Sequence, residues 1–378
     1  MRLMRQAVVR SDSSGETGKV APVSERPDSA GKRRVELLKE VLRGNQRVWI
    51  LTHDNPDPDC MAGGLALLAL LREGFGLDAS IVYGGIIGRA ANRGMVRLLE
   101  IPMRHIETLA PRPEERFICV DTQPSFTNNS LPDGADVAAV IDHHPLETDE
   151  RVPFVDVRPG YGAVASMTAE YLLDAGQEIT PPLATAIAFG IASETEDLER
   201  EASEGDLAAY VQVLPRVDHR LLGQLRHPKI ERAFFQTLAG ALQGARSCHD
   251  VVMCHMDAIN VPDEVAQVAD ILNSLAGSTW VLCTGEYEGS LIVSLRSSDN
   301  SASAGRVLER ALAGKGNAGG HGMIAGGRVP LDADSDREQI CRELTEAVLA
   351  ALGYEKDSPL EPLLPAAGED GARTNGGR

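Results

Sequence analysis

The sequence predicts two α/β domains joined by a helical connector. Short apolar strands alternate with helical segments over residues 32–205 and again over 246–355, a pattern typical of sheets covered by helices. A length of 378 residues also fits two or three domains. We therefore expect a parallel-sheet domain first and a smaller α/β domain second.

The first domain is expected to begin with a helix over 32–42 and a buried strand over 47–52, because the apolar residues have helical spacing in the former and run continuously in the latter. Further apolar runs predict strands over 79–83, 117–121 and 137–141. The segments around them predict helices over 60–72, 90–99, 164–174 and 183–193. Helices on both faces of one sheet account for this alternation.

Residues 206–245 have a helical pattern broken by Pro215 and Pro228, and we interpret them as the connector. A glycine-rich segment over 314–327 is expected to be a flexible loop whose backbone N–H groups can approach an anion. The rest of the second domain is expected to contain strands over 250–255, 280–284 and 291–296 and helices over 264–275, 302–313 and 337–352.

The composition limits the possible functions. The formal net charge is −18, from 37 basic and 55 acidic residues, which argues against a general nucleic-acid or anionic-membrane coat protein. The six cysteines lack the spacing of a disulfide framework, so we expect reduced thiols and a cytoplasmic location. No apolar run reaches the ~18 residues of a membrane helix. Residues 1–31 and 356–378 are expected to be disordered tails.

A chemically rich segment follows the first buried strand, at the place where open α/β sheets bind ligands. Residues 53–59 read HDNPDPD, and the two prolines keep this turn out of a helix. Asp57 and Asp59 are two residues apart and point in different directions in an extended loop, which suits two neighbouring cations better than one. A simpler interpretation is an acidic turn with a helix-capping aspartate. This segment alone leaves both open.

Two more strands end in comparable residues. One ends in Asp121, and the next is followed directly by Asp142, His143 and His144. Parallel strands bring their carboxyl ends to one edge of a sheet, so we expect these side chains to meet His53 there. Carboxylate and imidazole without thiolate suit Mn²⁺, Fe²⁺ or Zn²⁺ and exclude a structural zinc site of the cysteine type. Three such strands favour a metal site over simple capping.

Taken together, these motifs resemble the DHH phosphoesterase superfamily. Other segments of the family pattern occur in the expected order: GGIIGR at 84–89 followed by Asn92, GIASET at 190–195, SLRS at 294–297 and GGHG at 319–322. The last two resemble the DHHA1 substrate-binding domain of oligoribonuclease and phosphoadenosine-phosphate phosphatase members. The resemblance covers about residues 45–330 and implies a site in the cleft between the two domains.

The resemblance implies two divalent metal ions, expected to be Mn²⁺. One ion would be held by His53, Asp57 and Asp121. The second would be held by Asp59, Asp121 and His143, so that Asp121 bridges the two. Ions arranged in this way activate water and clamp phosphate oxygens.

The family's fourth motif normally reads Gly-Ile-x-Thr-Asp-Thr and supplies one more aspartate ligand. Here Glu194 takes that place, and Asp197 is the alternative ligand. The resemblance also implies that His144 faces the substrate phosphate and that Asp142 orients a histidine. The substrate-binding residues that it implies are Arg89, Asn92, Arg296, Ser297, Gly319, Gly320 and His321.

The implied activity is hydrolysis of a phosphate ester in a short single-stranded oligoribonucleotide or a small nucleotide. An acidic protein body would repel a long polyanion, so we expect neither long duplex nucleic acid nor a membrane as partner, while a homodimer stays open. The alternatives are an inorganic pyrophosphatase or exopolyphosphatase-like hydrolase, and a catalytically weak nucleotide-binding regulator, which Glu194 keeps in view. The pairs Cys248-His249 and Cys254-His255 lack the spacing of a zinc knuckle.

Overall fold

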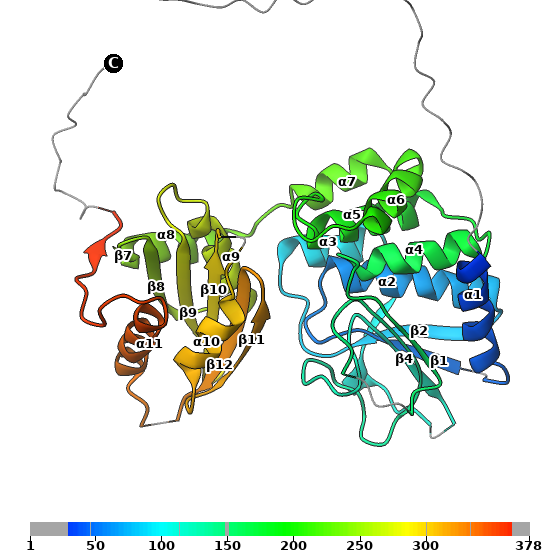
Figure 1. The fold of residues 1–378 in the computed structure, drawn as a ribbon, viewed down its shortest axis with the longest axis horizontal. Helices are drawn as coiled ribbons and strands as arrows, with labels where there is room; N and C mark the ends of the chain where they lie inside the picture. Colours follow the sequence, from blue (N-terminus) through cyan, green and yellow to red (C-terminus); the bar gives the residue numbers. More distant parts are fainter. Residues whose placement is uncertain are drawn as a thin grey trace, which may run out of the picture.

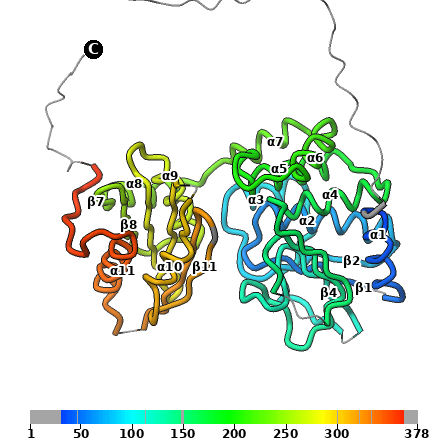
Figure 2. The backbone as a smooth tube through the Cα atoms, in the orientation of Figure 1, coloured from blue at the N-terminus to red at the C-terminus, as the bar shows by residue number. Residues whose placement is uncertain are grey.

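The computed structural model describes residues 29–364 apart from 46, 113, 148–150, 300 and 333. It confirms two α/β domains, each built on its own sheet (Figure 1). The chain passes from the first domain to the second through residues 227–231 (Figure 2). The tails expected to be disordered lie outside the described residues over 1–28 and 365–378.

The sheet of the first domain is parallel throughout, as predicted, with the strand order β3-β2-β1-β4-β5-β6. Its central strands are buried apolar runs, which parallel sheets covered on both faces require. The short edge strands β3 and β6 lack that signature and were not predicted. The strands are β1 (Arg47–Leu51), β2 (Asp78–Tyr83), β3 (Met103–His105), β4 (Arg116–Val120), β5 (Asp136–Asp142) and β6 (Phe154–Val157).

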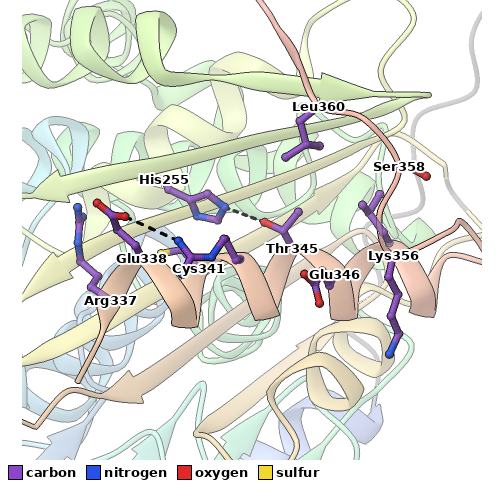
Figure 3. Close-up of a pocket in the computed structure, with 11 residues that line it drawn as sticks. His255, Arg337, Glu338, Cys341, Thr345, Glu346, Lys356, Ser358 and Leu360 are labelled. Carbon is purple, nitrogen blue, oxygen red and sulfur yellow. Dashed lines mark hydrogen bonds and ion pairs between the residues drawn. The ribbon is translucent and has the colours of Figure 1, made fainter. Parts of the chain in front are cut away.

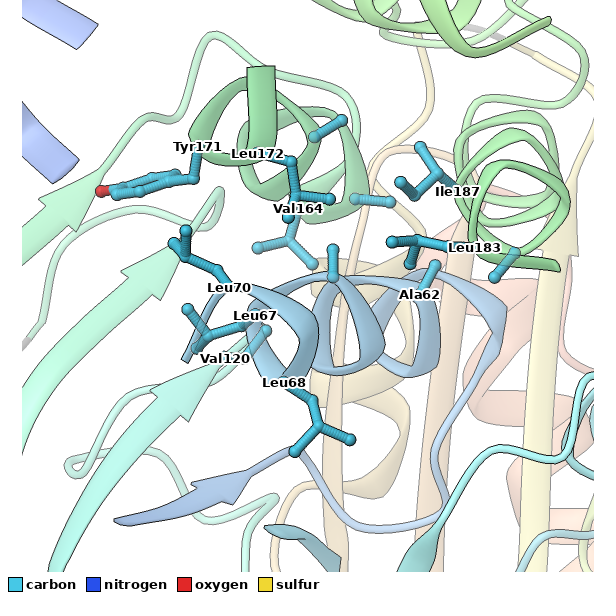
Figure 4. Packing of buried hydrophobic residues seen from close by; sticks show 14 of the residues in the cluster. Ala62, Leu67, Leu68, Leu70, Val120, Val164, Tyr171, Leu172, Leu183 and Ile187 are labelled. Atoms are coloured by element: carbon cyan, nitrogen blue, oxygen red, sulfur yellow. The ribbon is translucent and has the colours of Figure 1, made fainter. Parts of the chain in front are cut away.

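Buried apolar side chains pack the helices of the first domain together (Figure 4). Glycines allow the helices to approach closely. An added Cβ on Gly190 would lie 2.8 Å from the Ala62 side chain, and one on Gly63 would lie 2.9 Å from Val164. The helices are α1 (Ser29–Val41), α2 (Pro58–Ala69) with a π-helical turn (Leu70–Gly74), α3 (Ala90–Leu98), a 3-10 turn (Ile106–Thr108), α4 (Val164–Asp174) and α5 (Pro181–Glu194).

The connector expected over 206–245 is instead divided between the two domains. Helices α6 (Glu204–Val213) and α7 (His219–Arg226), with the 3-10 turn Leu214–Arg216 between them, bury apolar side chains in the core of the first domain. Helix α8 (Arg232–Gly244) instead buries Phe234 and Ala241 against the second sheet. The apolar faces of these helices decide which domain each one joins.

The second domain has a mixed sheet with the order β11-β12-β10-β9-β8-β7-β13, in which only β8 and β9 pair in parallel among the described strands. The strands are β7 (Arg246–Cys248), β8 (Val251–Ala258), β9 (Trp280–Tyr287), β10 (Ser290–Ser297), β11 (Asn317–His321), β12 (Ile324–Pro330) and β13 (Glu361–Pro362). The helices are α9 (Asp263–Asn273), α10 (Ala304–Leu312) and α11 (Arg337–Ala351).

Two expectations for the second domain were wrong. The glycine-rich segment 314–327 is not a flexible loop, because most of it forms the antiparallel hairpin β11–β12. Glycine is needed there: Gly320 has φ +154°, and an added Cβ would lie 2.3 Å from the Ile324 carbonyl oxygen. The tail expected to be disordered from 356 is partly ordered, because residues 361–362 pair with β7. No described helix is both long and apolar enough to span a bilayer.

Candidate metal centre

The loop after β1 places His53 and Asp57 side by side. Asp57 is the N-cap of α2, and its Oδ1 accepts hydrogen bonds from the backbone N–H groups of Asp59 at 2.9 Å and Cys60 at 3.0 Å. Its other oxygen, Oδ2, lies 3.5 Å from Nε2 of His53. One carboxylate therefore both caps the helix and faces an imidazole, so the two interpretations of this turn are compatible.

Asp121 lies at the centre of the cluster, directly after β4. Its Oδ2 is 3.6 Å from Nε2 of His53, and its Oδ1 is 3.3 Å from Nε2 of His143 and 3.6 Å from Nδ1 of His144. The residue is 3% exposed, and its Oδ1 accepts no hydrogen bond. Its φ of +60° is a conformation that residues other than glycine adopt at a cost. Backbone strain combined with a buried oxygen that accepts no hydrogen bond is typical of a functional position.

Two groups of possible ligands share Asp121. Within each group, one donor atom from every member lies within 4.8 Å of the donors of the others. The first group contains His53, Asp57, Cys60 and Asp121, and the second contains Asp121, His143 and His144. The donor set fits divalent metal ions, because imidazole nitrogens surround the buried Asp121 carboxylate and its Oδ1 accepts no hydrogen bond.

Asp59 is the predicted ligand that the structure places differently. Its two oxygens accept hydrogen bonds from the backbone N–H groups of Val164 at 2.7 Å and Ala165 at 2.8 Å, at the start of α4. The residue is 1% exposed, and burial together with the negative charge of Asp121 raises its pKa well above the usual range. Asp59 thus joins α2 to α4 and is not in either ligand group among the described residues.

The two histidines after β5 are held by partners behind them. Nδ1 of His143 lies 3.1 Å from the Tyr161 carbonyl oxygen and donates to it, which turns Nε2 toward Asp121. Nδ1 of His144 lies 2.9 Å from Oδ1 of Asp142, which is fully buried and also accepts from the Gln123 side chain at 2.8 Å. Burial disfavours a charged His144, but the hydrogen bond to Asp142 outweighs it and raises the pKa of His144.

Glu194, rather than Asp197, faces the cluster. Burial, with repulsion from Asp57 and Asp121, raises the pKa of Glu194 to about 7. Asp197 is exposed and accepts a hydrogen bond from Arg226 at 2.7 Å, away from the metal centre. The sequence left Glu194 and Asp197 as alternative ligands. Their surroundings differ because Glu194 is the last residue of α5, whereas Asp197 lies in the turn that follows it.

The candidate substrate residues Arg89 and Asn92 have defined protein partners. Arg89 lies 3.5 Å from the carboxylates of Asp263 and Asp270 and so links the two domains. Asn92 is buried and donates to the Pro56 carbonyl at 3.1 Å, which supports the turn that carries His53 and Asp57. Asn92 therefore lies behind the loop that carries His53 and Asp57.

The remaining candidates lie on the second sheet. Arg296 is buried, and its Nε donates to Asp270 at 2.6 Å. Ser297 is buried and accepts from the Asp299 backbone at 3.1 Å. Gly319 and Gly320 lie in β11, which also contains His321, whose side chain is outside the described part of the chain.

A cavity of about 270 Å³ lies between the domains. Asn55, from the ligand loop, forms one side of it. The N-terminal end of α9 and strands β10 and β12 form the rest, including Arg296, Gly326 and Gly327. The cavity therefore reaches the ligand loop at Asn55, while no residue of the two ligand groups lines it.

A larger cavity of about 460 Å³ lies elsewhere, between α11 and residues 356–360 (Figure 3). His255 lines it, and its two ring nitrogens contact the hydroxyl groups of Thr284 at 2.9 Å and Thr345 at 2.8 Å. These contacts bind strands β8 and β9 to α11. His255 and its neighbour Cys254 are in no ligand group of the described residues.

Sequence reasoning missed three contributors to the centre. Cys60 directly follows Asp59 in the first turn of α2. A thiol next to a candidate ligand, at the start of a helix that follows the ligand loop, is a signal that can be read from the sequence. Gln123, two residues after Asp121, donates to Asp142. The Tyr161 carbonyl gives no sequence signal, because any residue type supplies one.

The first domain carries histidines and aspartates clustered at the carboxyl edge of a parallel sheet, and a mixed-sheet domain follows it. The family profile of the DHH N-terminal domain matches residues 47–191, and that of the DHHA1 domain matches residues 250–350. An uncharacterized protein of Methanocaldococcus jannaschii is 30% identical over 357 residues, which cover 89% of this chain and 73% of that protein. The chain belongs to the DHH superfamily of phosphoesterases.

Solved structures share the fold. An exopolyphosphatase-related protein from Bacteroides fragilis superimposes with a TM-score of 0.69 at 12% identity, covering 84% of this chain and 96% of that one. RecJ from Thermus thermophilus, in complex with Mn²⁺, superimposes with a TM-score of 0.51 at 18% identity, covering 90% of this chain and 57% of RecJ. At these identities the similarity establishes the fold alone.

Proposed function

We propose that this protein is a metal-dependent phosphoesterase that hydrolyses short oligoribonucleotides or small nucleotides. The observation that carries the proposal is the meeting of His53, Asp57, His143 and His144 around the buried Asp121 carboxylate, whose Oδ1 accepts no hydrogen bond. Such a donor set serves divalent ions better than it serves a protein core, where a buried carboxylate oxygen without a hydrogen bond is costly.

Divalent ions bound in this centre would lower the pKa of a water molecule and offset the charge of the phosphate oxygens. His53, Asp57, Asp121 and His143 would hold them, and the RecJ structure in complex with Mn²⁺ supports manganese as one such ion. His144 stands beside the centre, oriented by Asp142, and its raised pKa makes it a positively charged contact for a phosphate oxygen.

The size of the interdomain cavity supports a small substrate. Its volume of about 270 Å³ is slightly below the range of typical ligand pockets, roughly 300–1,000 Å³. Arg296 and the backbone of Gly326 and Gly327 line the wall opposite Asn55 and can contact a nucleotide or terminal phosphate there. The net charge of −18 agrees, because it disfavours long polyanions.

The test is a substrate panel with a metal titration. Purified protein is incubated with a short RNA, a nucleoside 3′,5′-bisphosphate, inorganic pyrophosphate and polyphosphate, with and without Mn²⁺. Hydrolysis of the RNA or the bisphosphate is expected. Preference for pyrophosphate or polyphosphate would instead favour the alternative that the exopolyphosphatase-related neighbour represents, and tight nucleotide binding without turnover would indicate a regulator.

Replacing Asp57, Asp121 or His143 by alanine should abolish metal-dependent hydrolysis while leaving the fold largely intact. The reason is that each side chain faces the cluster rather than the apolar core. Activity is measured on the preferred substrate, and folding by circular dichroism. Full activity in any of these variants would contradict the proposed function.

A further inference from the structure

Cys60 lies in the metal centre, although the sequence analysis treated it as an ordinary buried thiol. It occupies the first turn of α2, directly after Asp59, and is fully buried. Its sulfur lies within 4.8 Å of donor atoms of His53, Asp57 and Asp121. The six cysteines are all unpaired, and none of the other five belongs to a ligand group of the described residues.

The spacing of this group fits a single ion with tetrahedral ligands. Two donors ~2.0–2.2 Å from an ion at the tetrahedral angle are about 3.3–3.6 Å apart. Nε2 of His53 lies 3.5 Å from Oδ2 of Asp57 and 3.6 Å from Oδ2 of Asp121. Both separations match those of ligands to one ion, and the Cys60 sulfur, within 4.8 Å of donor atoms of all three residues, would make a set of four.

The Asp121 carboxylate is the member that the two ligand groups share. The residue is 3% exposed, and its Oδ1 accepts no hydrogen bond from the described protein. That oxygen faces His143 and His144, whereas Oδ2 faces His53. The Cys60 thiol contacts the Asp57 carbonyl oxygen at 3.4 Å and also interacts with the His53 imidazole. The unbonded oxygen supports a ligand at the shared carboxylate, and the clustering of the Cys60 sulfur with His53, Asp57 and Asp121 points to a ligand at the thiol.

We propose that Cys60 is the fourth protein ligand of the ion held by His53, Asp57 and Asp121, and that this ion is Zn²⁺. The inference rests on the metal centre of the proposed function and specifies its chemistry. On binding, the S–H bond of Cys60 breaks, the sulfur keeps the electron pair and bonds to the ion, and the proton goes to solvent.

A thiolate ligand changes which metal this position selects. Thiolate sulfur favours Zn²⁺, whereas carboxylate and water favour Mn²⁺ and Mg²⁺. The group of Asp121, His143 and His144 has no sulfur. The two positions are therefore chemically different, and the centre is expected to hold Zn²⁺ in the Cys60 position and a harder ion such as Mn²⁺ beside it.

The experiment uses Co²⁺ as a probe in the full-length protein. Metal is removed with a chelator, Co²⁺ is added, and the visible d–d bands report cobalt binding, while a near-ultraviolet sulfur-to-cobalt band reports a thiolate ligand. The wild type should show both. Cys60→Ala and Cys60→Ser should lose the sulfur band, and Cys119→Ala, which removes another buried cysteine of the same domain, should keep it.

A competition with Zn²⁺ and Mn²⁺ gives the second measurement. Loss of Cys60 should weaken Zn²⁺ binding by at least about tenfold, with a much smaller effect on Mn²⁺. Wild-type protein with d–d bands but no sulfur band would overturn the Cys60 assignment alone, whether or not a Cys60 variant folds. Absence of any cobalt binding, together with absence of hydrolysis, would overturn the metal centre and the proposed function as well.

Discussion

At the scale of single residues, the two aspartates nearest His53 are built in opposite ways. Asp57 is well satisfied, because one of its oxygens caps α2 and only the other faces the centre. Asp121 combines a left-handed backbone with a buried oxygen that accepts no hydrogen bond. Each of these two features costs roughly 1–3 kcal/mol in a folded protein. Bound ions would remove the second cost.

Asp121→Asn should therefore remove most of the heat stabilisation that Mn²⁺ confers. Wild-type protein should gain about 2.7 kcal/mol when the ion is present at about 100 times its Kd, because the ion binds the folded state. Calorimetry with and without Mn²⁺ measures the gain. Asp133→Asn, at an exposed position of the same domain, is the matched control. An undiminished gain in the Asp121 variant would place the ions elsewhere.

At the scale of elements, the hairpin β11–β12 depends on one glycine much more than on its neighbour. Gly320→Ala should destabilise the second domain by about 1–3 kcal/mol, since a Cβ would collide with the Ile324 carbonyl and the backbone has a positive φ. Gly319→Ala meets no atom within 4 Å and should cost much less. Urea unfolding of both variants gives the comparison. Equal losses would contradict the assigned hairpin geometry.

The joint between β8, β9 and α11 should be sensitive to acid. Burial lowers the pKa of His255 to about 4, so below its ordinary pKa of about 6.5 the unfolded chain binds a proton that the folded chain does not. Stability should then decrease as the pH falls from about 6.5 to about 4, by up to roughly 3 kcal/mol.

Unfolding free energies of the wild type and His255→Gln across this pH range test the joint. The variant should lose much of the slope, because its amide does not titrate and can still contact Thr284 and Thr345. His219→Gln, at an exposed histidine, should keep the wild-type slope. Identical slopes in all three proteins would show that His255 does not contribute.

The sequence predicted elements well where burial dictates the pattern, as in the central strands of the first sheet. It missed the hairpin at 317–330 because glycine usually favours loops, and here backbone pairing outweighs that preference. In the site, strand ends predicted that His53, Asp121 and His143 would meet. The predicted ligand Asp59 accepts two backbone hydrogen bonds at the start of α4, and its neighbour Cys60 lies beside His53 and Asp57. The sequence could not show this, because successive residues of a helix point in different directions and only tertiary packing shows which one faces the loop.

At the scale of the whole molecule, exposed ion pairs hold the domains next to each other. Arg89 contacts Asp263 and Asp270, and Arg93 contacts Glu231 at 3.1 Å, with side chains that are between 20% and 75% exposed. Such pairs are weak singly and are screened by salt. The interdomain cavity is therefore bounded by contacts that can be broken at little cost.

The double variant Arg89→Ala, Arg93→Ala should increase the radius of gyration measured by small-angle X-ray scattering at low salt. High salt should have the same effect on wild-type protein, because it screens the same pairs. Arg104→Ala, at an exposed arginine of the first domain, serves as the control and should scatter like the wild type. An unchanged radius in the double variant would mean that other contacts hold the domains.

The left-handed backbone at Asp121 has a consequence for how this chain can change over generations. Glycine at that position would relax the backbone strain and remove the buried oxygen that accepts no hydrogen bond. The thermal stability of the protein should then rise while the proposed hydrolysis is lost. Selection for thermal stability and selection for catalytic activity therefore oppose each other at this residue. A laboratory selection for thermal stability alone should therefore enrich variants that have lost catalytic activity.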